Sequence, residues 1–121
     1  MKVWSVSYTY SKPLHISKRI VGLGKTKMKY MKVDWIHSFK DEPVKIYGEL
    51  NETMDEQRKI EVFLDGSYGY AVLDGAEHRS FVSEAKWATK EEIEKDSQFQ
   101  VSCISKKEFE EVWIKAVDTS K

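Results

Sequence analysis

Four side chains in the middle of the chain could form a general acid–base site: His37, Glu49, Arg58 and Glu61. Each lies on or beside a predicted β-strand, so the four could converge. Charged residues on the solvent face of an antiparallel sheet are, however, what exposure alone produces. The sequence therefore favours a protein without catalytic residues. An enzyme would need His37, Glu49 and Arg58 to meet within hydrogen-bonding distance.

Two other patterns resemble ligand sites only in part. Gly22-Leu23-Gly24-Lys25-Thr26 ends like a phosphate-binding P-loop, but Arg19 stands where that motif needs its first glycine. The motif also needs a helix to follow, whereas a strand is predicted here. The three histidines lie far apart in different predicted elements, and Cys103 is isolated. We therefore expect neither a metal site nor a cofactor.

Alternation of apolar and polar residues predicts the elements that carry these side chains. It indicates strands at residues 3–10, 30–37, 44–50, 57–64 and 67–73, and residues 99–104 are compatible with another. Asp41-Glu42-Pro43 and Asp65-Gly66 are turn signals, so the central strands should form an antiparallel meander. One face of the meander should be apolar and the other charged, with Tyr47 and Phe63 among the charges. Residues 74–88 have no regular pattern.

Two capping boxes predict helices in the last third of the chain. Thr89 with Glu92 begins a short helix, and Ser105 with Glu108 begins a longer one. The longer helix has an apolar stripe that should lie on the sheet. The predicted fold class is α+β: an antiparallel meander of about five to six strands, with two helices near the C-terminus packed on one face.

Charge divides the chain into two parts of opposite sign. The first 33 residues contain eight bases and no acid, whereas residues 34–121 contain 20 acids and 12 bases. We therefore separate a basic N-terminal strand and arm, residues 1–27, from a single α+β domain, residues 28–121. Such a division bears on partners more than on fold. A single cysteine and the lack of a long apolar run favour a cytoplasmic protein without a membrane segment.

Residues 28–114 resemble a family of small bacterial domains of unknown function. The resemblance rests on Val33-Asp34-Trp35-Ile36-His37, Asp41-Glu42-Pro43-Val44, Arg58-Lys59-Ile60-Glu61-Val62-Phe63, Asp65-Gly66 and Gly69-Tyr70-Ala71, together with Glu108-Phe109-Glu110 and Trp113 near the C-terminus. Small acidic domains of this kind are similar to immunity proteins, which bind and block one cognate bacterial toxin. The resemblance therefore implies a binding protein whose partner is a toxin.

An acidic domain suits a toxin that cuts nucleic acid, because such a toxin needs a basic cleft. The predicted partner-binding residues are exposed acids with aromatic neighbours: Asp34, Asp41, Glu42, Tyr47, Glu49 and Glu61. Two alternatives use the basic arm instead. The arm could bind nucleic acid through its charge and aromatic residues, although the acidic domain would repel a polyanion. Its strand could also pair with the sheet of a second copy to form a homodimer.

Overall fold

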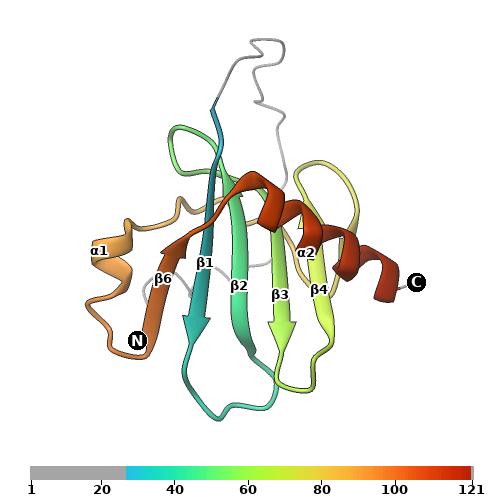
Figure 1. Ribbon diagram of the computed structural model, residues 1–121, viewed down its shortest axis with the longest axis horizontal. Coiled ribbons are helices and arrows are strands. Elements are labelled where there is room, and N and C mark those ends of the chain that lie inside the picture. The colour runs from blue at the N-terminus through green and yellow to red at the C-terminus, as the bar shows by residue number, and fades with distance from the viewer. Residues whose placement is uncertain (1–26, 121) are drawn as a thin grey trace.

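The computed structural model describes residues 27–120, so the predicted strand at 3–10 and the arm up to residue 26 lie outside the described residues. The elements are β1 (Lys29–Trp35), β2 (Pro43–Leu50), β3 (Glu56–Phe63), β4 (Tyr68–Val72), β5 (Glu77–His78), α1 (Lys90–Ile93), β6 (Phe99–Cys103) and α2 (Lys106–Thr119). The strands of this part of the chain form one antiparallel sheet in the order β5-β4-β3-β2-β1-β6 (Figure 1). Strands β1 to β4 are the predicted meander, β5 lies in a segment predicted to be irregular, and β6 returns to pair with β1. The α+β fold class is confirmed.

Helix α2 crosses one face of the sheet, as its apolar stripe predicts (Figure 1). Ser105 caps its first turn by accepting a hydrogen bond from the Glu108 amide at 3.0 Å. Phe109 and Ala116 are fully buried against Tyr47 and Ile60 of the sheet. Burying one large apolar side chain stabilises a fold by about 1.5–3 kcal/mol, so this contact holds the helix in place.

Helix α1 packs on the opposite face, which differs from the prediction that both helices share one face. Neighbouring residues of a strand point to opposite sides, and β1 shows which helix covers which side. The Tyr30 ring meets Phe109 of α2 at a centroid distance of 5.2 Å. Met31 belongs instead to a core cluster with Ile93 of α1 and with Trp87. The sequence pattern predicts one apolar face and one charged face, whereas the structure has an apolar cluster on each face, one under each helix.

Residues 79–89, here called the strap, cover this second face together with α1. The sequence predicts an irregular segment there, but Ser83 and Trp87 of the strap are buried. The short strand β5 directly precedes the strap, within the segment that was predicted to be irregular. Beneath the strap, Lys59 and Glu61 of β3 are only 1% and 4% exposed. The prediction of an exposed charged face is therefore wrong for β3, because the strap removes that face from solvent.

Gly48 of β2 lets the strap approach the sheet. A Cβ atom at this position would lie 2.6 Å from Cζ2 of Trp87, a distance that real Cβ atoms essentially never show. Both groups are buried, and the ring is fixed by a hydrogen bond from its Nε1 to Glu56. A side chain at position 48 would therefore push the Trp87 ring off the sheet.

We expect Gly48→Ala to lower the free energy of unfolding by about 1–3 kcal/mol, the usual cost of overpacking a core. Urea denaturation followed by circular dichroism measures this change. In a Trp87→Leu background the same substitution should cost less, because the ring that clashes is gone. An equal cost in both backgrounds would show that the strain comes from somewhere other than Trp87.

Candidate functional site

Arg58 joins the sheet to α2 through two carboxylates. Glu49 and Arg58 are paired across β2 and β3. The Nε and Nη2 atoms of Arg58 donate to the two carboxylate oxygens of Glu49 at 2.8 and 3.0 Å. Its Nη2 and Nη1 atoms also donate to Glu110 of α2 at 2.6 and 3.1 Å. This arrangement, here called the Arg58 clamp, directs the fork of the guanidinium at both partners.

The surroundings of the clamp fix its charge states. The guanidinium lies over the rings of Phe109 and Trp113, 4.9 and 5.0 Å from their centroids. Burial alone would lower the pKa of Arg58, but its hydrogen bonds to Glu49 and Glu110 raise it above its ordinary value. The Tyr30 hydroxyl donates to Glu49 at 2.9 Å. Burial and this hydrogen bond raise the pKa of Tyr30 to about 12. The clamp is therefore a satisfied structural network.

His37 does not join the clamp. It follows the end of β1, in the loop to β2, whereas Glu49 pairs with Tyr30 near the start of β1. The Phe39 amide donates to Nδ1 of His37 at 2.8 Å. The proton of the neutral ring is therefore on Nε2, which donates to the Pro43 carbonyl at 2.8 Å. The imidazole organises its own loop.

The acid–base constellation predicted as an alternative is therefore not assembled. Its fourth member, Glu61, is buried on the strap-covered face, away from α2. Metal binding has no better support within residues 27–120, where no three His, Cys, Asp or Glu side chains are grouped so that they could hold an ion. What remains of the candidate chemistry is structural: Glu49 and Arg58 bind each other, and His37 binds loop backbone.

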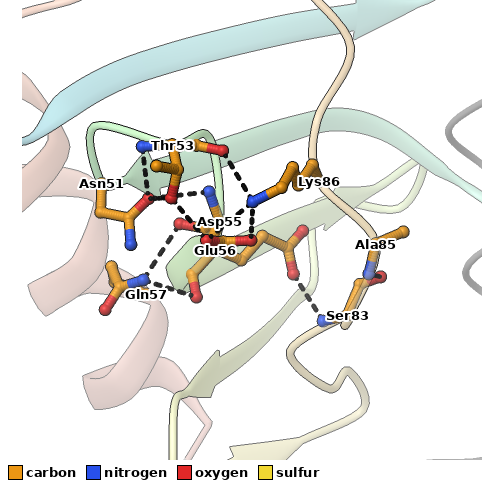
Figure 2. A network of polar contacts seen from close by, with 8 residues as sticks. All are labelled: Asn51, Thr53, Asp55, Glu56, Gln57, Ser83, Ala85 and Lys86. Carbon is orange, nitrogen blue, oxygen red and sulfur yellow. Dashed lines mark hydrogen bonds and ion pairs between the residues drawn. The ribbon is translucent and has the colours of Figure 1, made fainter. Parts of the chain in front are cut away.

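Glu56 holds the strap from below. Its Oε1 atom accepts a hydrogen bond from the Ser83 amide at 2.7 Å, drawn in Figure 2. Its Oε2 atom accepts from Nε1 of Trp87 at 2.7 Å and lies 3.4 Å from Nζ of Lys59. All four of these residues are buried. A buried carboxylate is tolerated when donors and a cation surround it, and Glu56 has both.

The turn between β2 and β3 fastens the far end of the strap. The Asn51 side-chain oxygen accepts hydrogen bonds from the amides of Thr53 and Asp55 at 3.0 and 2.9 Å. Lys86 of the strap reaches over this turn and donates to Asp55 at 3.0 Å and to the Thr53 carbonyl at 3.2 Å (Figure 2). Burial would raise the pKa of Asp55, but the hydrogen bonds from Thr53 and Lys86 lower it. These polar groups therefore hold the turn and the strap together.

The six predicted partner-binding residues fall into different places. Asp41 is exposed and Glu42 partly exposed in the β1–β2 loop. Asp34 is partly exposed on β1 and forms an ion pair with Lys45 at 3.1 Å. The expectation of exposure is met by these three residues. Whether they bind a partner stays a prediction.

The other three predicted residues are covered by other parts of the domain or held in an ion pair. Tyr47 is buried beneath α2, where burial and then the charge of Glu108 raise its pKa. Glu49 is held in the Arg58 clamp, and Glu61 is covered by the strap. Alternation places each of them on a strand face that looks exposed. Their burial depends on α2 and the strap, which come from distant parts of the chain.

Sequence reasoning missed three exposed apolar residues at one end of the sheet. The β1–β2 loop, residues 36–42, and the β3–β4 turn, residues 64–67, lie at the same end (Figure 1). We call this region the loop end. Ile36, Phe39 and Leu64 are 57%, 53% and 63% exposed there. Asp41, Glu42 and Asp65 stand in the same two segments. The sequence contains a signal for the exposure of Ile36 and Phe39, because both follow the last inward-facing residue of β1 and precede a turn.

Comparison with known proteins gives one match. The family model "Domain of unknown function (DUF6881)" matches residues 29–118. No curated protein and no solved structure matches the chain. Over the described residues, neither helix has the length and apolar character needed to cross a membrane.

Proposed function

This chain belongs to the DUF6881 family of domains of unknown function, and we propose that it is an immunity-type binding protein that blocks a cognate bacterial toxin through an acidic surface. The partner in this proposal is a toxin with a basic active-site cleft, such as a nuclease. Neutralisation would take place in the cytoplasm, where such a toxin would otherwise reach the nucleic acids of its own cell.

The acidic excess of the folded domain carries the proposal. Residues 27–120 contain 20 Asp and Glu against 14 Lys and Arg. Two of these bases, Arg58 and Lys59, point inward and pair with Glu49, Glu110 and Glu56. These pairs neutralise three acids and two bases, which leaves 20 − 3 = 17 acids against 14 − 2 = 12 bases, so the domain keeps an acidic excess. An acidic surface attracts a basic protein over distance and raises the rate of association, which suits an inhibitor that must find its toxin quickly.

The geometry of the candidate chemistry also favours binding over catalysis. His37 hydrogen-bonds the backbone at both of its ring nitrogens. Arg58 directs its fork at Glu49 and Glu110, between the sheet and α2. An enzyme would need such groups to face a substrate. Their use in local structure supports a proposal in which the domain acts by binding through its surface.

Co-expression with the product of the adjoining gene tests the proposal. The neighbour alone should arrest growth, the chain should restore it, and the two purified proteins should co-elute on gel filtration. A neighbour that is harmless alone, or a pair that elutes separately, would contradict the proposal. Salt-sensitive binding to RNA or DNA that disappears on deletion of residues 1–27 would instead favour the nucleic-acid alternative.

A further inference from the structure

The loop end contains most of the exposed large apolar side chains of the domain. Five such side chains are exposed within residues 27–120, and Ile36, Phe39 and Leu64 account for three of them. The other two, Met28 and Ile114, lie apart, at the start of β1 and on α2. Single exposed apolar residues are ordinary, whereas several at one end of a small sheet are typical of an interaction surface.

Phe39 is held in position before any partner arrives. The His37 ring contacts both neighbouring rings: it is tilted by 53° against Trp35 at a centroid distance of 4.1 Å, and it is stacked on Phe39 at 5.2 Å. Trp35 is buried in the core cluster, so this row of rings is anchored in the domain. An exposed aromatic residue that is already ordered loses little conformational entropy on binding, which favours its use as an anchor.

Backbone hydrogen bonds fix the rest of the β1–β2 loop. At its start, the Ile36 amide donates to the Gln98 carbonyl at 2.8 Å, which ties the loop to the segment before β6. At its end, the Pro43 carbonyl accepts from Nε2 of His37, while Nδ1 of the same ring accepts from the Phe39 amide. His37 therefore bridges the middle and the end of the loop. This bridging presents Ile36 and Phe39 in a defined geometry.

Acids outnumber bases in the two segments that carry these anchors, although Arg79 donates to Ser67 of the β3–β4 turn at 2.8 Å. The β1–β2 loop carries Asp41 and Glu42 against one base, Lys40, and the β3–β4 turn carries Asp65. Asp65 is exposed, and hydrogen bonds from Ser67 lower its pKa, so it is charged at neutral pH. Apolar side chains with an acidic rim are complementary to a basic surface that contains an apolar pocket.

We propose that the loop end is the surface through which this domain binds its toxin, with Phe39, Ile36 and Leu64 as apolar anchors and Asp41, Glu42 and Asp65 directed at basic groups of the partner. This inference rests on the proposed function and names the site that performs it. The occupant is a protein surface with a pocket for an aromatic ring, bordered by Lys or Arg side chains. Three of these six residues are hydrophobic, and none of the three follows from the charge pattern alone.

Two sets of substitutions test the surface with matched chemistry. The loop-end variant carries Phe39→Ala, Asp41→Asn and Glu42→Gln. The control variant carries Ile114→Ala, Asp118→Asn and Glu111→Gln on the outer side of α2, where Ile114 is 58% exposed and both acids are exposed. Each set removes one exposed apolar side chain and two negative charges. Their unfolding midpoints should therefore differ little from that of the wild type.

Binding of each purified variant to the product of the adjoining gene is measured by surface plasmon resonance. The loop-end variant should bind at least about tenfold more weakly than the wild type, since loss of an anchor costs more than about 1.4 kcal/mol. Its association rate should also fall less with added salt, because two steering charges are gone. The control variant should bind as the wild type does.

The outcomes separate the two proposals. If the wild type binds and the two variants lose affinity equally, or neither loses affinity, the loop end is not the binding surface. The proposed immunity function would still stand in that case. Loss in the control variant alone would place the surface on α2. If the wild type forms no complex with the adjoining product, the proposed function fails and the loop-end proposal fails with it.

Discussion

Replacing Glu56 with alanine should lower the free energy of unfolding by about 3–5 kcal/mol, the cost of removing one partner from a buried ion pair. The carboxylate accepts from the Ser83 amide and the Trp87 indole, both at 2.7 Å, and lies 3.4 Å from the Lys59 ammonium. Its loss leaves two donors and a cation in a region that the strap keeps from solvent. Urea denaturation measures the change.

A surface residue of the same type provides the control. Glu52 is exposed in the β2–β3 turn, four residues before Glu56, and Glu52→Ala should change stability by no more than about 0.5 kcal/mol. In a Lys59→Met background, Glu56→Ala should cost less than in the wild type, because the charge that needs the carboxylate is gone. Similar losses for Glu52→Ala and Glu56→Ala would mean that Glu56 does not hold the strap.

The Glu56 network also shows where sequence reasoning ends. Alternation of apolar residues and turn signals predict β1 to β4, and the capping boxes at Thr89 and Ser105 predict both helices, because these signals depend on neighbouring residues. The contact from Glu56 to Trp87 spans 31 residues. Nothing local marks residues 79–89 as a covering segment. Lys59 and Glu61 therefore look exposed in the sequence, although they are buried.

The candidate surface was predicted only in part for a similar reason. Asp41 and Glu42 were identified because charge can be read from the sequence. Ile36 and Phe39 were not, because an apolar residue beside a strand is usually assigned to the core. Their exposure follows from the end of β1 at Trp35 and from the hydrogen bonds of His37, which turn the loop outward. Tyr47 was predicted to be exposed because the sequence does not show that α2 covers it.

The second large effect concerns Arg58. Arg58→Ala should lower the free energy of unfolding by about 3 kcal/mol, the lower end of the range for buried pairs, because the side chains of Arg58 and Glu110 remain partly exposed. Arg58→Lys should lose most of the same stability, since an ammonium cannot bind Glu49 and Glu110 with the paired geometry of a guanidinium. Arg79→Ala is the control, because Arg79 is exposed. It should cost less than about 1 kcal/mol.

Acid should reduce the difference in stability between the wild type and Arg58→Ala. The hydrogen bond from Arg58 lowers the pKa of Glu110 below its ordinary value in the folded state. The folded state therefore binds fewer protons than the unfolded state in the window between the two pKa values. The stability from this pair is present above the ordinary pKa and is lost as pH falls through the lowered one. A difference that stays constant from neutral pH into this window would contradict the assignment of Glu110 to the clamp.

The same variant separates structure from function. The clamp ties α2 to β2 and β3 on one face of the sheet, whereas the loop end lies at the end of the strands beyond Trp35 and Phe63. At a temperature where Arg58→Ala is still folded, it should bind the product of the adjoining gene with the affinity of the wild type. If a folded Arg58→Ala protein loses binding while the loop-end variant keeps it, the clamp would be the functional site, and the roles assigned to these two regions would be exchanged.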